Sequence, residues 1–353
     1  MQTMSDSHRE ARSRLDRLWR RGAAFLGCPL PIMGGAMTWL SERHLVAAIS
    51  NGGGFGVIAS GAMSPDQLAA EIAGTLALTD RPFGVNLIIM HPELMQLIDV
   101  CLDHRAGHVV LAGGLPRSAA IKRVKAGGAK VMCFAPAHSI ARKLVRGGVD
   151  AIVIEGMEAG GHTGPVSTSV LAQEILPHVT EVPVFVAGGM GRGEAILAYL
   201  EMGAAGCQLG TRFVCAGEST AHPSFKRAFM RASARDAVLS VQLDPRFPVI
   251  PVRAIANQAT REFLEVQRQM IDQVDRGVLD MQAAQLEIEH FWAGALRRAA
   301  IDGDVENGSL MAGQSVGMVT CEQSTAEILS ELVEQTVAAL AARESGSRDG
   351  TAA

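Results

Sequence analysis

The sequence predicts an α/β protein that folds as a (β/α)8 TIM barrel, with a helical insertion after strand eight. Two observations carry this prediction. Short apolar, β-branched runs such as 151–155 recur at intervals of roughly 25 residues, each followed by turn signals and a helical pattern. Such runs are typical of strands that are buried on both faces of a parallel sheet. Eight of them favour a closed barrel over the alternative, a doubly wound open sheet.

The eight expected strands follow one another as far as residue 213. They lie at 31–36, 54–60, 83–89, 108–114, 130–135, 151–155, 182–189 and 206–213. Helix signals fill the intervals between them. Gly52 ends one helix, and the segment from Ser64 to Gln67 begins the next with a capping box and a proline at the first helical position.

The pattern changes after the eighth strand. Residues 216–300 contain helical patterns without a strand of the earlier type, which predicts a helical insertion. A capping box from Ser324 to Glu327 begins an amphipathic helix that would supply the eighth barrel helix. The expected organisation is a helical lead-in at 1–25, a barrel at 26–215 and 301–343, the insertion at 216–300, and a disordered tail at 344–353.

The composition excludes several classes of protein. The chain has 353 residues, 48% of them hydrophobic, and a net charge of −4, which provides no basic footprint for nucleic acid. Its six cysteines form no C-x-x-C pair and no zinc-like cluster, so we expect no metal site and a reducing cytoplasmic location. No secretory signal and no apolar run long enough for a membrane span are predicted.

The segment 155–164 carries the strongest chemical signal. It follows a buried strand and contains Glu155, Glu158, a glycine pair and His162. Barrel enzymes place their sites at the carboxyl ends of the strands, and histidine exchanges protons near neutral pH, so His162 is the predicted catalytic residue. The alternative is a structural histidine bonded to a nearby carbonyl. Glu155 lies so close to the buried strand that we expect it to have a partner.

Two glycine-rich turns predict a phosphate site. One spans 188–191 after the seventh strand, and the other is the Gly210-Thr211 turn in the eighth. Loops after these two strands commonly bind phosphate in barrels, because their backbone N–H groups point at the anion. The alternative is that the glycines only make tight turns. Their occurrence together in both positions favours phosphate binding.

Seven segments together resemble the FMN-dependent nitronate monooxygenase family, and most closely its branch of flavin-containing enoyl-acyl-carrier-protein reductases. The segments are 31–39, 83–86, 155–164, 187–193, 210–213, 221–223 and 303–314. The resemblance spans the chain from about residue 26 to about residue 342. It implies FMN bound on the barrel, with the insertion covering the flavin and the active site.

The resemblance also implies roles for single residues. Those expected to line the flavin or lie along it are Met33, Gly34, Gly35, Asn86, Glu155, Gly160 and Gly161. Those expected to hold its phosphate are Gly188, Gly189, Gly210 and Thr211, while Met311, Gly313 and Gln314 would return to the flavin edge from the C-terminal loop. His162 matches the family's active-site histidine. Some relatives carry a lysine where this chain has Cys133-Phe134, so no role for that lysine is transferred.

The leading hypothesis for function is an oxidoreductase in which NAD(P)H reduces FMN and the flavin passes hydride to an enoyl thioester, free or linked to a carrier protein. The alternative is a nitronate monooxygenase that uses O2. A weaker alternative is a flavin-free isomerase or aldolase acting on a phosphorylated substrate, although no lysine suited to Schiff-base chemistry ends a strand. A non-catalytic flavin or nucleotide binder is disfavoured by His162. The sequence leaves a homodimer open.

Overall fold

An eight-stranded parallel barrel forms the centre of the computed structural model, which describes residues 6–247 and 250–349. Its strands are β1 (Ile32–Gly34), β2 (Val57–Ala59), β3 (Gly84–Ile88), β4 (His108–Ala112), β5 (Lys130–Phe134), β6 (Ala151–Glu155), β8 (Val184–Ala187) and β9 (Gly206–Leu209). Their order around the barrel is β1-β9-β8-β6-β5-β4-β3-β2. A parallel bridge between Met33 and Phe55 closes the circle. The predicted (β/α)8 fold is confirmed.

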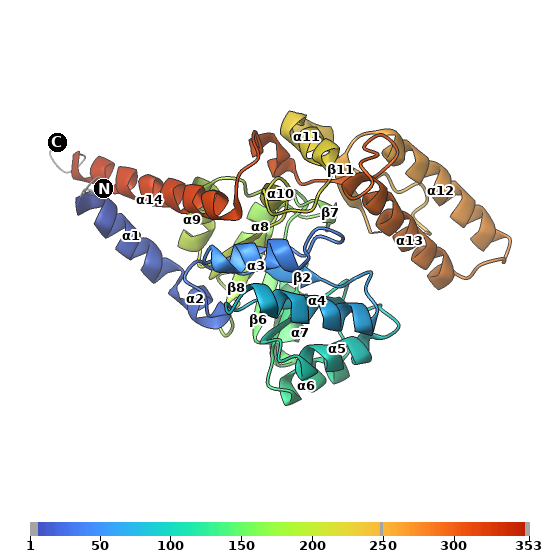
Figure 1. Cartoon of the computed structure of the whole chain (residues 1–353), viewed down its shortest axis with the longest axis horizontal. Coiled ribbons are helices and arrows are strands. Elements are labelled where there is room, and N and C mark those ends of the chain that lie inside the picture. Colours follow the sequence, from blue (N-terminus) through green and yellow to red (C-terminus); the bar gives the residue numbers. More distant parts are fainter. Residues whose placement is uncertain (1–5, 248–249, 350–353) are drawn as a thin grey trace.

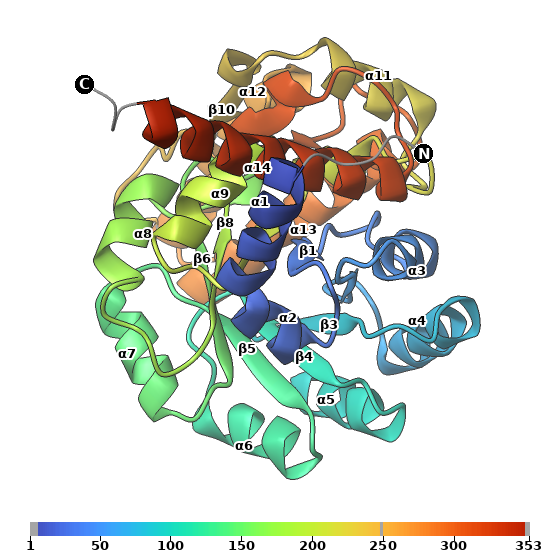
Figure 2. The same cartoon turned by 90° about the vertical axis from the view of Figure 1, so that its left-hand side faces the viewer.

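Helices surround the barrel (Figure 2). They are α3 (Arg43–Asn51), α4 (Pro65–Leu78), α5 (Leu94–Asp103), α6 (Ser118–Ala126), α7 (His138–Arg146), α8 (Thr168–Ile175), α9 (Gly193–Glu201) and α14 (Thr325–Asp349). The capping box predicted before α4 is present, since Ser64 and Gln67 bond each other's backbone N–H groups. Helix α14 contacts both α9 and α3, so it completes the ring as the eighth barrel helix.

The lead-in forms two helices, α1 (Asp6–Leu18) and α2 (Arg20–Leu26). Helix α1 packs on α14, and Phe25 of α2 contacts the rings of His108 and Phe185 at the amino-terminal ends of the strands. Within the barrel, Met33, Phe55, Met132, Val153 and Phe185 belong to one buried apolar cluster. The barrel is therefore a filled core, and ligands must bind at its rim.

The C-terminal boundary differs from the prediction. Helix α14 continues to Asp349, whereas the sequence predicts a tail that begins at residue 344. Adding one residue to a helix that is already formed costs little, which explains how it extends through small and charged residues. The last four residues of the predicted tail, 350–353, lie outside the described residues.

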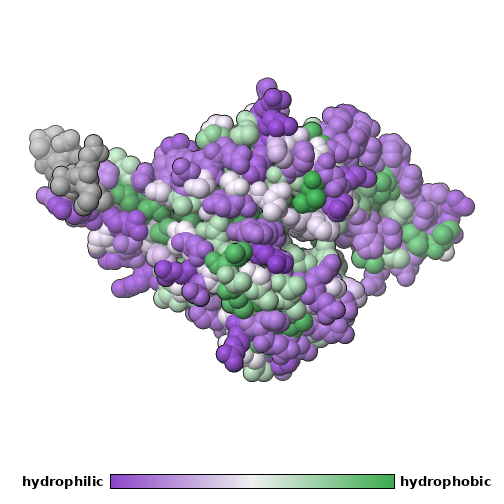
Figure 3. Space-filling model, viewed as in Figure 1, coloured by the Kyte–Doolittle hydropathy of each residue, from purple (hydrophilic) through white to green (hydrophobic). Residues whose placement is uncertain are grey.

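The insertion projects from one end of the barrel (Figure 1). Helix α10 (Thr211–Val214) leads from β9 into it, and it contains α11 (Pro223–Arg231), the 3-10 turn Ala234–Asp236, β10 (Ala237–Leu239), β11 (Val252–Ile255), α12 (Gln258–Asp275) and α13 (Met281–Ala300). Helices α12 and α13 pack side by side around a core that includes Phe263, Ile288 and Trp292. The space-filling view shows a hollow between this part and the barrel (Figure 3).

The insertion is not purely helical, which corrects the prediction. Strand β11 is the centre of a small antiparallel sheet with β10, β7 (Gly161–His162) and β12 (Leu310–Met311). The 3-10 turn Gln314–Met318 comes after β12 in the chain. These strands have two to four residues each, too few to give a period-two pattern in the sequence. No helix among the described residues is long and apolar enough to cross a membrane.

Candidate active site

The carboxyl ends of β8 and β9 bring the two glycine-rich turns together. Ala187 and Gln208 are partners in the ladder between these strands, so the loops that follow are neighbours. Gly188 and Gly189 have φ of 97° and 73°, which glycine adopts readily and other residues do not. In the described part of the chain, the backbone N–H groups of Gly188, Gly189, Gly210 and Thr211 donate no hydrogen bond to the protein. Four free donors from two adjacent loops fit a phosphate group.

The C-terminal loop meets this pair of turns. The N–H of Gly313 donates to Oγ1 of Thr211 at 3.0 Å, and the N–H of Gln314 donates to the carbonyl of Glu158 at 2.9 Å. A Cβ on Gly160 would lie 2.5 Å from the nitrogen of Gly313. Gly160 is therefore required for close packing of two backbones. Met311, in β12, pairs with Ala254 of β11.

The end of β1 supplies the next predicted residues. Met33 is fully buried in the barrel core. A Cβ on Gly34 would meet Cδ1 of Ile49 in α3 at 2.6 Å, so this glycine allows helix packing and directs no side chain toward the barrel mouth. The N–H of Gly35 donates to the carbonyl of Leu209 at 2.8 Å, which ties β1 to β9 beside Gly210.

Asn86 lies within β3, and Glu155 ends β6 on another part of the barrel. Asn86, in β3, is 7% exposed, and its carbonyl accepts a 2.7 Å hydrogen bond from Oγ of Ser60. Glu155 ends β6 and is half-buried. Removal from water raises the pKa of its carboxyl to about 8. Contrary to our expectation, its carboxylate has no hydrogen-bond or ionic partner among the described side chains, so at neutral pH it is mostly a neutral hydrogen-bond donor.

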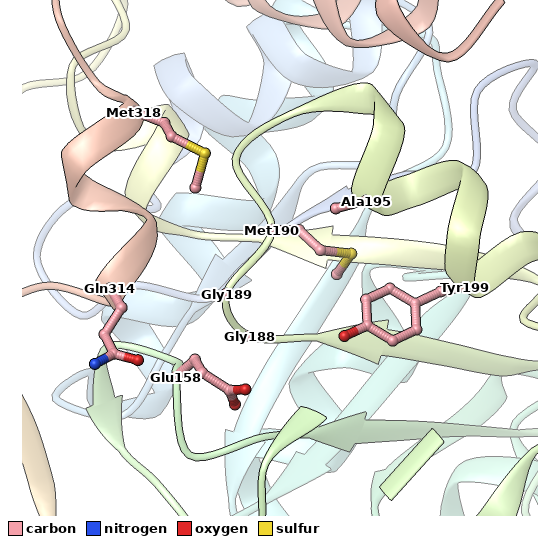
Figure 4. Close-up of a pocket in the computed structure, with 8 residues that line it drawn as sticks. All are labelled: Glu158, Gly188, Gly189, Met190, Ala195, Tyr199, Gln314 and Met318. Atoms are coloured by element: carbon pink, nitrogen blue, oxygen red, sulfur yellow. The ribbon is translucent and has the colours of Figure 1, made fainter. Parts of the chain in front are cut away.

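A cavity of about 250 Å3 lies beside the β8 loop (Figure 4). Its lining residues are Glu158, Gly188, Gly189, Met190, Ala195, Tyr199, Gln314 and Met318. Oε2 of Glu158 accepts hydrogen bonds from the N–H and the hydroxyl of Thr168, both at 2.9 Å. Thr168 begins α8, so Glu158 places a negative charge at the positive end of that helix. Glu158 thus has a structural role at the start of α8.

His162 lies where the segment 155–164 meets the insertion. It is in β7 and pairs with Val252 of β11, and Gly161 before it has φ of 76°. Nε2 of His162 is 3.1 Å from Oε2 of Glu289 in α13. The two atoms are within ion-pair distance but lack hydrogen-bond alignment, and this buried Nε2 has no other partner among the described residues. The His162 side chain is 38% exposed, so the rest of the ring faces open space.

Sequence reasoning missed Glu289. It lies in α13 among other charged residues, and no local motif distinguishes it from a solvated glutamate. Only the pairing of β7 with β11 and the packing of α13 bring it to His162. His222 caps α11 by accepting a hydrogen bond from the N–H of Ser224 at 3.1 Å, which is a structural role.

These features define a class of protein: a TIM barrel with two adjacent glycine-rich turns after β8 and β9 and a partly exposed histidine after β6, at the end of the barrel where enzymes of this fold carry their sites. The family model for nitronate monooxygenase matches residues 23–97 and 93–335. The chain therefore belongs to the nitronate monooxygenase family and is a flavin-dependent oxidoreductase.

Three similar proteins illustrate the range of this family. A Mycobacterium tuberculosis enzyme named (3aS,4S,5R,7aS)-5-hydroxy-7a-methyl-1-oxo-octahydro-1H-indene-4-carboxyl-CoA dehydrogenase is 30% identical over 339 residues, covering 87% of this chain and 93% of that protein. FabK from Thermotoga maritima is 34% identical, with a TM-score of 0.80 over 90% of this chain and 95% of that one. A nitroalkane oxidase from Streptomyces ansochromogenes is 26% identical, with a TM-score of 0.75 over 91% and 99%.

Proposed function

We propose that this protein is an FMN-dependent NAD(P)H oxidoreductase that reduces the carbon–carbon double bond of an enoyl thioester. The observation that carries the proposal is the position of His162. It follows β6, pairs with β11 and faces α13, with part of its side chain exposed where the barrel meets the insertion. A proton-carrying group at this place is what reduction of a conjugated thioester needs in addition to a hydride source.

FMN fits the residues present. The four free N–H groups of the β8 and β9 turns would hold its phosphate, and Glu155 at the rim would donate a hydrogen bond to the cofactor. When bound, FMN would supply the hydride transfer that no side chain of the protein can perform. The protein's own part is to bind the cofactor, orient the substrate and deliver a proton.

His162 performs the proton step in this proposal. When hydride reaches C3 of the enoyl thioester, negative charge develops on the thioester oxygen. A protonated His162 stabilises that charge and gives its proton to C2, so that the product is the saturated thioester. Because the ring is 38% exposed, solvent can return the proton to His162 after each turnover.

Similarity supports a thioester substrate. The Mycobacterium tuberculosis relative is named for a carboxyl-CoA substrate, and the chain resembles FabK at 34% identity along 90% of its length. The nitronate monooxygenase alternative is supported by the likeness to a nitroalkane oxidase at 26% identity. In that chemistry His162 would remove the acidic proton of a neutral nitroalkane.

Anaerobic rapid mixing of the FMN-loaded enzyme distinguishes the two. We expect NADH or NADPH to bleach the flavin absorbance and crotonyl-CoA, a short enoyl thioester, to restore it. The expected cofactor is non-covalent FMN, which heat release and chromatography will identify. Bleaching by nitroethane or its anion, with none by either nicotinamide, would overturn the proposal in favour of the alternative.

A further inference from the structure

The insertion presents one face of α13 to the barrel mouth. Glu289 faces His162, and one helical turn later the carbonyl of Ala293 accepts a 3.0 Å hydrogen bond from the indole N–H of Trp39, in the loop after β1. Residues four apart lie on the same side of a helix. Two contacts on one face therefore join α13 to two different barrel loops, which fixes the position of Glu289 relative to His162.

The contact also offers a partner to a buried nitrogen, Nε2 of His162, that otherwise has none among the described residues. Nε2 of His162 is buried and has no hydrogen-bond partner among the described residues, and such atoms normally have one. Oε2 of Glu289, 3.1 Å away, is within bonding distance, and a small rotation of the ring or the carboxylate would align the two. The side chain of Glu289 is 31% exposed, so water screens the pair only partly.

The neighbouring carboxylates have other partners or roles. Glu158 is bonded to Thr168, and Glu155 is mostly neutral. Glu287, two residues before Glu289 on α13, faces His290 at 3.6 Å and is 54% exposed. Of these carboxylates, Glu289 is the one that contacts His162.

We propose that Glu289 is a positioning residue for His162, contributed by the insertion to the proton-transfer step. Its carboxylate holds the ring through Nε2 and balances the positive charge of the imidazolium, so that the opposite side of the ring faces the substrate. The proton passes from His162 to the substrate, and Glu289 remains ionised throughout. The insertion thus completes the active site as well as covering it.

This inference rests on the role of His162 in the proposed function. A double-mutant cycle on the FMN-loaded enzyme tests it: wild type, Glu289→Gln, His162→Ala and the double variant, with Glu287→Gln as the matched control on the same helix. We expect Glu289→Gln to slow reoxidation by crotonyl-CoA about 10–100-fold. Flavin content and the rate of reduction by NAD(P)H should stay near wild type, and Glu287→Gln should match wild type throughout.

The cycle separates positioning from a general effect on structure. In the His162→Ala background, the Glu289→Gln change should cost nothing further, because the group that it positions is gone. An equal cost with and without His162, or a Glu289→Gln enzyme as fast as Glu287→Gln, would overturn the inference.

Failure of the proposed function would give a different result. If crotonyl-CoA does not reoxidise the wild-type enzyme but nitroethane reduces it, the substrate assignment fails, and the same four proteins are compared with nitroethane, where non-additivity is again expected. A substrate-independent readout uses enzyme labelled with 13C-histidine. The NMR signal of the His162 ring should move in Glu289→Gln and stay in place in Glu287→Gln, and an unmoved signal in both would contradict the contact.

Discussion

His162 combines a buried nitrogen with an open ring face, and these two features define its chemistry. The buried Nε2 lies at Glu289, while 38% of the side chain remains exposed. In the proposed function, the buried nitrogen holds the ring in place and the exposed part of the ring meets the substrate.

Replacement of His162 by alanine should therefore affect one half of the catalytic cycle. We expect reduction of the bound flavin by NAD(P)H to be nearly intact, because His162 transfers no proton in that step. Reoxidation by crotonyl-CoA should slow by about 10²–10⁴-fold, the usual contribution of a general acid. Stopped-flow absorbance of the flavin measures both steps. Equal slowing of both would indicate a role in cofactor binding instead.

Gly189 is the residue at which the proposed phosphate cradle is easiest to test. Its φ of 73° is unfavourable for a side chain, and a Cβ there would lie 3.1 Å from Cβ of Glu158. Gly189→Val should weaken FMN retention while the barrel still folds, because the added side chain obstructs the close approach of the backbone to the phosphate. Flavin content per protein after gel filtration is the measurement.

A second glycine provides the control for this variant. Gly203, after α9, also has positive φ, 106°, but a Cβ there meets nothing within 4 Å. Gly203→Val carries comparable backbone strain away from the two turns. It should lower thermal stability and leave FMN content at the wild-type level. Equal loss of FMN in both variants would mean that strain, and not the cradle, controls retention.

Part of the candidate site could be predicted from local sequence. The glycines at 188 and 189 and the histidine at 162 follow strands that are recognisable as buried, so their place at the rim was evident. Gly34 and Gly160 are also glycines at or after predicted strands. In the structure, however, they allow close packing against α3 and against the 312–313 backbone. A glycine in the sequence shows that space is needed, but only the fold shows what fills it.

At the scale of elements, the eight strands were predictable because each is a continuous apolar run. The small sheet around β11 was not, because its partners come from three separate parts of the chain and contribute only a few residues each. Its function is nevertheless central. It joins β7, which carries His162, to the insertion.

Arg253 of β11 strengthens that junction. It is 4% exposed, its Nε donates to the carbonyl of Met157 at 2.8 Å, and its Nη1 donates to the carbonyl of Ala237 at 2.5 Å. Through these two hydrogen bonds, Arg253 links the segment 155–164 to β10 across the sheet. The neighbouring Asn257 is also used internally, because its side chain caps α12.

Substitution of Arg253 by methionine should loosen the insertion. The buried carbonyl of Ala237 and the partly buried carbonyl of Met157 would lose their donors, at a cost of about 1–3 kcal/mol each. We expect a lower melting temperature and faster proteolysis within 216–300. Arg261→Met is the control, since the side chain of Arg261 is 67% exposed and reaches Glu306 only at 3.8 Å. Indistinguishable digestion of the two variants would argue against Arg253 as the link.

At the scale of the whole molecule, the stability of the cofactor-free protein should depend on the ionisation of Glu155. Burial raises the pKa of this carboxyl from 4.5 to about 8. Between these values the folded protein holds a proton that the unfolded chain has released. The free energy of unfolding must then fall as pH rises through this window, because the folded state has to give up that proton.

Glu155→Gln removes this dependence, because the amide does not titrate and has nearly the same shape. At and below pH 4.5 the two proteins should differ little in stability, since Glu155 is protonated in the folded state and at least half protonated in the unfolded chain. As pH rises toward 8 the variant should become progressively more stable than wild type, and above 8 the difference should level off. Chemical denaturation of both cofactor-free proteins between pH 5 and 9 gives the difference curve, in which the other titrating groups cancel. A flat difference would show that the Glu155 carboxyl is well solvated, and a difference of opposite sign would show that an unrecognised cation stabilises its charged form.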